Sequence, residues 1–371
     1  MKTFTNEEYM LIQLANAAGL DKLTYEERLA KAEEQSAPDN PLWFKTKKAL
    51  EAYRRGEPIG LPIWFDAISS GLQILSLISR DRQGMELTGT IKPRGKEVRP
   101  NPYKQIQQLL GLESVPYEDI KKAVMTHFYG SHSIPKRVFQ SHLNHFLETV
   151  KELFSGAAQI RDAAVKAWNP EAKSYQWTMP DGFHVYLPVT TSVEREATLE
   201  DYQLTLRIRE TQMRAQPFGL SLAANFTHSV DAYLLRTILR HTNYDREWLL
   251  NQKSQIEERW DTTQWLERTD GQITDLNLPV ESLSEEEAVF MYQDIEDTLS
   301  YPSFSVLTVH DCFAALPKHM NRLRRQANRA YAQLYKDPRM ERLLTRVTGF
   351  KPKRFNAKTY AAIIEADYAL T

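Results

Sequence analysis

The sequence is poor in cysteine: Cys312 is the one thiol among 371 residues. An intrachain disulfide and a cysteine-based zinc site are therefore excluded, and a reducing compartment is expected. Net charge is also lacking, because 47 basic side chains face 48 acidic ones, so no global basic excess points to a polyanionic partner. The composition is otherwise that of a globular protein, with 42% hydrophobic residues, which excludes wholesale disorder.

Long hydrophobic runs are missing as well. The most apolar window, residues 60–79, contains Asp66, Ser69, Ser70 and Gln73, which a lipid bilayer tolerates only at high cost. The first eight residues are polar and lack the apolar stretch of a signal peptide. We therefore expect a protein without a membrane segment.

Several familiar enzyme signatures are absent too. Gly89 and Gly95 are followed by Lys96 and Glu97, which have neither the spacing nor the Ser or Thr of a phosphate-binding P-loop. The sequence contains no Gly-x-Gly-x-x-Gly and no His-Glu-x-x-His, and its nine histidines form no close metal-ligand cluster. Dinucleotide-binding and zinc-protease chemistry therefore have no support.

The balanced total hides two blocks of opposite charge. Residues 318–358 contain 13 basic and 2 acidic side chains, whereas residues 245–297 contain 4 basic and 15 acidic ones. A smaller basic loop occupies residues 92–99. Two interpretations are open: either both large blocks are solvated faces, or the basic block faces a polyanion and the acidic block faces protein or solvent.

Hydrophobic periodicity predicts a helix-rich α+β fold. Apolar runs at 61–66, 304–309 and 312–316 predict strands, and the last two flank His310-Asp311 as a tight β-hairpin. Alternating residues at 184–189 and 203–209 predict a second pair of strands with a polar connection. Helical spacing predicts helices over residues 6–17, 24–35, 117–129, 320–334 and 357–367, and another that follows residue 66 and ends near residue 81.

Two aspartates stand at the ends of apolar strands. Asp66 follows residues 61–65, and Asp311 lies at the tip of the predicted hairpin. A carboxylate next to core strands is costly unless it is paired, hydrogen-bonded or bound to a cation, although a single such aspartate is usually a turn or cap residue. Two of them suit Mg²⁺, which prefers oxygen ligands and takes the remaining ones from water and phosphates. Two such ions can stabilise the attacking and leaving oxygens of a phosphoryl displacement.

The predicted helix at 117–129 carries basic side chains on one face. Lys121, Met125 and Tyr129 follow one another at intervals of four, Lys122 borders that face, and Gly130 comes next. Such a face offers two ammonium groups to a triphosphate, a thioether and an aromatic ring. The alternative is an ordinary amphipathic helix whose lysines are solvated.

These residues resemble a known family, the single-subunit RNA polymerases of bacteriophages and mitochondria. Residues 66–73 resemble motif A of that family, Lys121-x7-Tyr129-Gly130 resembles motif B, and residues 310–313 resemble motif C, in the family's order. The likeness extends over nearly the whole chain. Further segments that resemble the family are residues 18–22, 177–183, 225–231 and 364–371.

The resemblance implies roles for individual residues. Asp66 and Asp311 would hold two Mg²⁺ ions, and Lys121 would bind the incoming phosphates. Tyr129 and His228 would sense the sugar 2′-hydroxyl. The catalytic set that it implies is Asp66, Asp311, Lys121 and Tyr129, and the nucleotide-binding set is Lys22, Lys121, Lys122, Met125, Tyr129, Gly130 and His228.

Three positions refine this expectation. Residues 69–71 are small where related DNA polymerases place a bulky glutamate, and this favours ribonucleotides. Tyr117 stands where the family has an arginine four positions before the motif B lysine, so triphosphate binding is either weaker or depends on another basic residue. Cys312 stands where serine is common in the family, which is a mild change.

The fold implied by the resemblance is a right-hand polymerase palm, with a small antiparallel sheet, and fingers. The thumb and the amino-terminal domain of the family are missing. The expected regions are a helical palm-insertion module at 1–57, palm with motif A at 58–81, fingers with motif B and a promoter-reading specificity hairpin (183–209) at 82–224, and palm with motif C, an acidic insertion (241–298) and a carboxy-terminal foot at 225–371.

The resemblance also implies partners. A catalytic polymerase half needs a DNA template, an RNA product and NTPs, and we expect a second polypeptide to supply the amino-terminal and thumb half. A single-stranded-DNA-binding or promoter-melting factor is a further candidate partner. The expected location is the cytoplasm of a host bacterium, with the gene carried by a bacteriophage.

Two other interpretations stay open at this stage. A fragment of a family-A-type DNA polymerase would share the metal-binding aspartates but would use dNTPs. A non-catalytic nucleic-acid-binding subunit of a polymerase complex would keep the fold and would tolerate the loss of Asp66 and Asp311.

Overall fold

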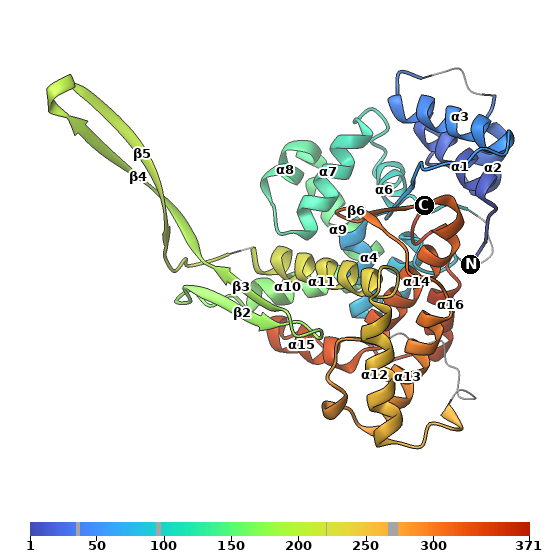
Figure 1. The fold of residues 1–371 in the computed structure, drawn as a ribbon. Helices are drawn as coiled ribbons and strands as arrows, with labels where there is room; N and C mark the ends of the chain where they lie inside the picture. Colours follow the sequence, from blue (N-terminus) through green and yellow to red (C-terminus); the bar gives the residue numbers. More distant parts are fainter. Residues whose placement is uncertain (35–37, 94–97, 220, 266–273) are drawn as a thin grey trace.

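The computed structural model describes residues 1–34, 38–93, 98–219, 221–265 and 274–371. Helices surround a small antiparallel sheet, and two-stranded ribbons extend from one side (Figure 1). The helix-rich α+β class expected from the sequence is confirmed. Among the described residues, no helix is both long and apolar enough to cross a bilayer. Parts of the basic loop (94–97) and of the acidic block (266–273) lie outside the described residues.

The first part of the chain alternates short helices with one strand. Side-chain caps explain several helix starts: Thr5 and Thr24 each form a capping box at the first two helices. The elements are α1 (Asn6–Ala17), α2 (Tyr25–Lys31), α3 (Pro41–Arg54), β1 (Ile63–Asp66), α4 (Ser70–Ser79), α5 (Arg82–Leu87), α6 (Pro102–Leu109), α7 (Tyr117–Phe128), α8 (Ser133–Phe139), η1 (Gln140–His142), α9 (Leu143–Leu153) and α10 (Ser155–Lys166).

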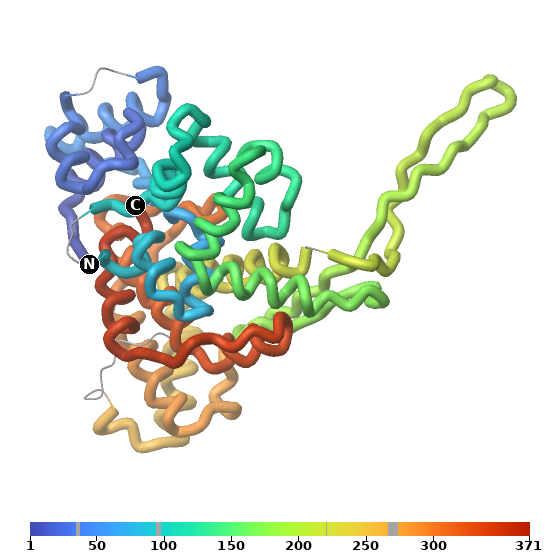
Figure 2. Tube along the Cα trace, turned by 180° about the vertical axis from the view of Figure 1, so that it is seen from behind, coloured from blue at the N-terminus to red at the C-terminus, as the bar shows by residue number. Residues whose placement is uncertain are grey.

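The second part contains both ribbons and the longest helices. In Figure 2, the first helices (blue) and α6–α8 (teal) stand side by side at one end of the molecule, as they do in Figure 1. The remaining elements are β2 (Ser174–Thr178), β3 (His184–Pro188), β4 (Thr190–Leu199), η2 (Glu200–Tyr202), β5 (Leu204–Met213), α11 (Ser221–Arg240), α12 (Arg246–Arg259), η4 (Val280–Ser282), α13 (Glu285–Leu299), β6 (Leu307–Val309), β7 (Cys312–Ala315), η5 (Pro317–His319), α14 (Met320–Lys336), α15 (Pro338–Thr348) and α16 (Ala357–Ile364).

The central sheet has the strand order β1-β7-β6, with antiparallel neighbours. The inward side chains of β1 are buried, whereas Asp66 at its end is exposed. Asp66 lies opposite Cys312 in the register of β1 and β7, and His310 and Asp311 form the turn between β6 and β7. His310 adopts a positive φ of 55°, which the tightest two-residue hairpins need at a central position. The hairpin predicted around His310-Asp311 is confirmed.

The last residues of the chain extend the sheet beside β1. Ala67 pairs with Leu370, and Asp66 and Thr371 exchange backbone hydrogen bonds of 3.1 and 2.9 Å. Tyr25 anchors this segment, because its hydroxyl donates to the carbonyl oxygen of Leu370 at 2.9 Å. The backbone of Asp66 is therefore held from both sides, by β7 and by residues 370–371.

Helix α4 lies at the centre of the main hydrophobic core, directly after this sheet edge. Nearly all of its residues are buried, because it is apolar on every side, as expected of a helix that other elements surround. Helices α10, α11 and α14 pack against it. Its one buried amide, Gln73, donates to the backbone carbonyls of Thr88 at 2.9 Å and Ala369 at 3.0 Å. These contacts give the residues after Asp66 a rigid support.

A projecting hairpin is present in the region expected at 183–209, but it consists of residues 190–213, and residues 184–188 belong to a separate ribbon. Strand β3 pairs with β2, and β5 pairs with β4, both antiparallel. The strands expected at 184–189 and 203–209 exist, but their pairing with each other was wrong. Each pairs with the strand that precedes it across a short loop, because closing a short loop costs less entropy than closing a long one. The β4–β5 ribbon projects far from the rest of the molecule (Figures 1 and 2).

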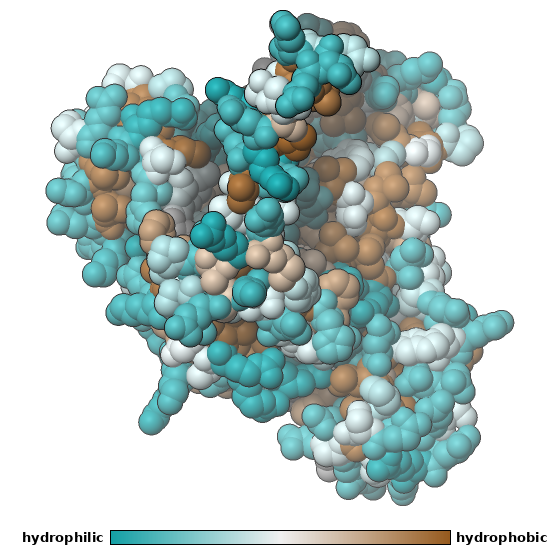
Figure 3. Space-filling model, turned by 90° about the vertical axis from the view of Figure 1, so that its left-hand side faces the viewer, coloured by the Kyte–Doolittle hydropathy of each residue, from teal (hydrophilic) through white to brown (hydrophobic). Residues whose placement is uncertain are grey.

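The projecting ribbon exposes apolar side chains on one face. Leu199 lies opposite Leu204, and both are exposed. The other face carries cross-strand ion pairs such as Arg209–Glu194, at 2.7 Å. Seen from the side on which the ribbon projects, the surface is mainly hydrophilic and is interrupted by hydrophobic patches (Figure 3).

The acidic block folds against the basic block. Helices α12 and α13 share a small hydrophobic core of their own. Arg329 of α14 binds Asp294 of α13 at 3.1 Å and also pairs with Asp297, which accepts from Arg322 at 2.9 Å. At these positions the acidic block faces protein, as one interpretation expected, whereas Arg322 and Arg329 face these carboxylates rather than a polyanion.

Candidate active site

Two aspartates from distant parts of the chain meet at one edge of the sheet. Asp66 ends β1, and Asp311 lies in the turn that precedes β7, the strand paired with β1. The backbone N–H of Ala67 donates to the carbonyl oxygen of Asp311 at 3.3 Å, which links the two segments directly. The predicted convergence of these segments is therefore present, and it follows from the antiparallel register of β1 and β7.

The Asp66 carboxylate occupies an electrostatically unfavourable position. The surrounding protein limits its hydration, and together with the charge of Asp311 this raises the pKa of Asp66 to about 6, against the opposing effect of Lys121. Two carboxylates without enough compensating charge suit a divalent cation. Within the described part of the chain, no group of three His, Cys, Asp or Glu side chains could hold a metal. A two-carboxylate donor set fits Mg²⁺, which keeps several of its waters.

A third carboxylate, Asp231, lies near this pair, and sequence reasoning did not identify it as a site residue. It belongs to α11 and is half-buried. Burial and Asp311 raise the pKa of Asp231 to about 6, whereas His310 acts in the opposite direction. Asp231 follows His228 by three positions, so both lie on one face of the helix. That spacing is the signal that could have identified it.

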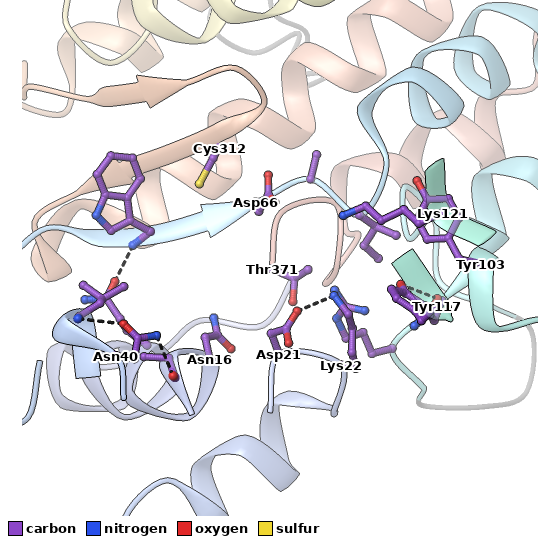
Figure 4. A pocket seen from close by; sticks show the side chains of 18 residues that line it. Asn16, Asp21, Lys22, Asn40, Asp66, Tyr103, Tyr117, Lys121, Cys312 and Thr371 are labelled. Atoms are coloured by element: carbon purple, nitrogen blue, oxygen red, sulfur yellow. Dashed lines mark hydrogen bonds and ion pairs between the residues drawn. The ribbon is translucent and has the colours of Figure 1, made fainter. Parts of the chain in front are cut away.

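A pocket of about 290 Å³ opens beside Asp66 (Figure 4). Its wall includes Lys22 from the α1–α2 connection, Arg99 from the α5–α6 connection and Lys121 from α7. Lys22 pairs with Asp21 at 2.6 Å. Lys121 makes no ion pair with any residue that the structure describes. Polar groups from separate segments thus converge on one cavity next to the aspartates.

Tyr129 and His228 form a second cluster. Their rings lie 5.1 Å apart, centre to centre, in an edge-to-face arrangement. The Tyr129 hydroxyl packs so closely on Gly71 that a Cβ atom there would lie 2.5 Å from it, so any side chain at this position would displace the Tyr129 ring. Burial, Asp231 and Asp311 raise the pKa of Tyr129 to about 12, and burial lowers the pKa of His228. Both side chains are therefore neutral near pH 7, and the Tyr129 O–H remains a hydrogen-bond donor.

The other expected nucleotide-binding residues have different surroundings. Lys122 is exposed on α7 and is not among the described residues that line the pocket. Met125 packs against the main core. Gly130 ends α7 with a positive φ of 92°, a conformation that favours glycine. Of the expected catalytic and nucleotide-binding residues, the pocket itself brings together Lys22, Asp66 and Lys121.

Cys312 also lines the pocket. It follows Asp311 in the sequence and lies opposite Asp66 in the register of β1 and β7. Burial and the charges of Asp66 and Asp311 raise the pKa of Cys312 to about 12. A thiol that keeps its proton at neutral pH is a poor nucleophile. The raised pKa therefore argues against a nucleophilic role for Cys312.

The arrangement suits charge stabilisation. Two carboxylates can hold a divalent cation, the unpaired Lys121 ammonium can bind an anion, and the neutral Tyr129 hydroxyl can donate a hydrogen bond. A substrate that carries both a polyphosphate and a hydroxyl group would use all three. Comparison with known family models and with curated proteins finds no match to this chain, so its function is inferred from these residues.

Proposed function

We propose that this chain is the catalytic subunit of a DNA-directed RNA polymerase, which adds NTPs to an RNA 3′ end by nucleotidyl transfer. The observation that carries the proposal is the meeting of Asp66 and Asp311 on adjacent strands, beside a pocket that contains Lys22 and Lys121. Phosphoryl transfer needs positioning and charge stabilisation rather than a covalent intermediate on the protein, and these side chains can supply both.

Asp66 and Asp311 would hold Mg²⁺. The raised pKa of Asp66 supports this role, because a bound cation would offset the repulsion between the two carboxylates. When bound, a pair of Mg²⁺ ions stabilises the attacking 3′-oxygen and the leaving pyrophosphate. The chain itself fixes the carboxylates, because β7 and residues 370–371 hold the backbone on both sides of Asp66.

Lys121 and Lys22 would bind the phosphates of the NTP. Lys121 has no ion partner among the described residues, so its ammonium group is available to an anion. Lys22 is oriented by Asp21 and by the Tyr117 ring, whose centre lies 5.9 Å from the Lys22 nitrogen. Two ammonium groups on the pocket wall would balance part of the triphosphate charge.

Tyr129, His228 and Gly71 would surround the sugar. The Tyr129 O–H keeps its proton and can donate to a 2′-hydroxyl. The contact with Gly71 keeps Tyr129 next to the residues that follow Asp66. Residues 69–71 carry only small side chains where related DNA polymerases place a glutamate, which supports NTPs over dNTPs.

The proposal extends to architecture and partners. The sheet with α4, α11 and α14 would be the palm, α6–α10 would belong to the fingers, and α1–α3 would be the helical insertion. A DNA template and an RNA product would lie across the palm. A second polypeptide would supply the thumb and the amino-terminal half, and a promoter-melting factor would assist initiation in the host cytoplasm.

The experiment is single-nucleotide addition to a labelled RNA annealed to template DNA, with Mg²⁺ and either NTPs or dNTPs. The protein is used together with any polypeptide that co-purifies with it, and the annealed scaffold removes the need for promoter melting. We expect addition of NTPs. Asp66→Asn and Asp311→Asn should each lose roughly a thousandfold or more, because charge stabilisation is usually the largest catalytic contribution in such sites.

Asp119→Asn is the matched control, because Asp119 is an exposed aspartate on α7 that does not line the pocket. It should keep full activity. No addition by the unaltered protein, or addition that survives both aspartate substitutions, contradicts the proposal. A preference for dNTPs would replace it with a DNA polymerase.

A further inference from the structure

Three cationic side chains reach the pocket beside Asp66, and they differ in their pairing. Lys22 is bound to Asp21 at 2.6 Å. Lys121 and Arg99 form no ion pair with any described residue. Two of the three cations thus form no ion pair, although Lys121 acts electrostatically on Asp66 and Arg99 acts on Asp21.

Arg99 is held in the pocket wall with most of its hydrogen-bonding capacity unused. One of its terminal nitrogens donates to the carbonyl oxygen of Pro100 at 3.3 Å, and its buried Nε–H has no partner. Burial lowers the pKa of Arg99, and the charge of Asp21 acts in the opposite direction. A partly buried guanidinium with an unpaired, buried Nε–H costs free energy that an anion would recover.

Arg99 lies close to the beginning of α7. It interacts electrostatically with Tyr117, the first residue of that helix, which stands one turn before Lys121. Tyr117 offers no positive charge, and its hydroxyl donates to the side chain of Asn101 at 3.3 Å. The α5–α6 connection therefore brings the Arg99 guanidinium close to Tyr117, where α7 has no positive charge of its own.

We propose that Arg99 binds the phosphates of the incoming NTP, together with Lys22 and Lys121. This inference rests on the proposed function and deepens it, because it assigns to Arg99 the positive charge near the triphosphate that Tyr117 cannot supply. A guanidinium presents a planar fork of N–H donors that can contact two phosphate oxygens at once, whereas an ammonium group acts as a point charge. Arg99 thus orients the polyphosphate, and the lysines mainly balance its charge.

The first test compares NTP dependence in Arg99→Ala, Arg99→Lys and Arg137→Ala. Arg137 is an exposed arginine on α8 that does not line the pocket, so it is the matched control. We expect Arg99→Ala to raise KM roughly 10- to 100-fold, because the variant loses a hydrogen bond to a charged group. Its kcat should change much less. Arg99→Lys should show a smaller rise, and Arg137→Ala none. An unchanged KM in active Arg99→Ala overturns this assignment and leaves the proposed function intact.

The second test uses inorganic tripolyphosphate and needs no catalysis. Isothermal titration calorimetry on the full chain should show weaker binding by Arg99→Ala, with thermal unfolding as the check that the variant is folded. If the unaltered protein adds no nucleotide but binds tripolyphosphate through Arg99, the proposed function fails and the phosphate-binding assignment stands. Equal binding by Arg99→Ala and the unaltered protein overturns the assignment.

Discussion

Helix α14 and the pocket beside Asp66 are both rich in cations, yet they use them in opposite ways. In α14, Arg322, Arg324 and Arg329 are buried, and each is bound. Arg324, for example, donates to the backbone carbonyl of Asp367 at 2.8 Å. In the pocket, Lys121 and Arg99 have no anionic partner among the described residues. Apart from the Nε–H of Arg322, the buried α14 arginines thus find acceptors within the chain, whereas Lys121 and Arg99 form no ion pair among the described residues.

The carboxylates in the two regions show the same difference. Burial alone would raise the pKa of Asp294 beside α14, but His241 and Arg329 lower it below its ordinary value. At the pocket, burial and Asp311 raise the pKa of Asp66 to about 6. Charge density along the sequence is thus a poor guide to ligand binding. What matters is whether the folded chain supplies each charge with a partner.

The largest effect on stability is expected from Asp294→Ala. This fully buried carboxylate accepts hydrogen bonds from His241 at 2.8 Å, from the backbone of Thr274 at 2.6 Å and from Arg329 at 3.1 Å. Its removal leaves a buried guanidinium without this partner, so we expect a loss of roughly 3–5 kcal/mol in the free energy of unfolding. Denaturant unfolding followed by circular dichroism measures the change.

The control for this substitution is Glu258→Ala, at an exposed position of α12. It should change the free energy of unfolding by less than about 0.5 kcal/mol. A loss below about 1 kcal/mol for Asp294→Ala would mean that the ion pairs of α14 are no more important than surface pairs. The distinction between the two regions would then be wrong.

The two regions should also respond to pH with opposite signs. The folded-state pKa of Asp66 is raised, so its contribution favours folding below the unfolded pKa near 4 and is lost as the pH rises through about 6. The folded-state pKa of Asp294 is lowered, so its contribution is present above pH 4 and is lost as the pH falls through the folded value. Asp66→Asn should therefore stabilise the metal-free protein at pH 8, although it abolishes activity.

Thermal unfolding between about pH 4 and pH 8, without Mg²⁺, measures this difference. The gain in Tm of Asp66→Asn should shrink towards zero at the acidic end, where the native aspartate is protonated. The deficit of Asp294→Asn should persist down to pH 4 and shrink only below it. If Asp66→Asn has the same Tm as the unaltered protein at pH 8, repulsion at the site is too weak to support a cation-binding role.

The central sheet could be predicted from the sequence, whereas the pairing of the outer ribbons could not. The apolar runs of β1, β6 and β7 and the His310-Asp311 turn between the last two are local signals. Strands β3 and β5 alternate equally well against any partner, because alternation defines a face but not a neighbour. The short loops that join β2 to β3 and β4 to β5 favour the observed pairs, and the alternation pattern does not reveal them.

The candidate site was predictable where a residue belongs to a recognisable segment. Asp66, Lys121 and Asp311 are such residues, and the structure places them in one region. Arg99 was not singled out, because nothing in the basic loop distinguishes an arginine that folds into a pocket from one that is solvated. The mutual neutralisation of Arg329 and Asp294 was missed for the same reason, since sequence shows charges but not which of them meet.

The smallest effect is expected from Arg325, which shares Asp297 with buried arginines but lies at the surface. Its side chain is 54% exposed and lies 3.1 Å from Asp297, whereas that of Arg322 is 6% exposed. Exposed ion pairs contribute little, so Arg325→Ala should change the free energy of unfolding by less than about 0.5 kcal/mol and leave nucleotide addition unchanged. Arg322→Ala should cost clearly more in denaturant unfolding, because Asp297 then loses a buried partner. Equal losses in the free energy of unfolding for Arg325→Ala and Arg322→Ala would show that burial does not determine how much an ion pair of α14 contributes.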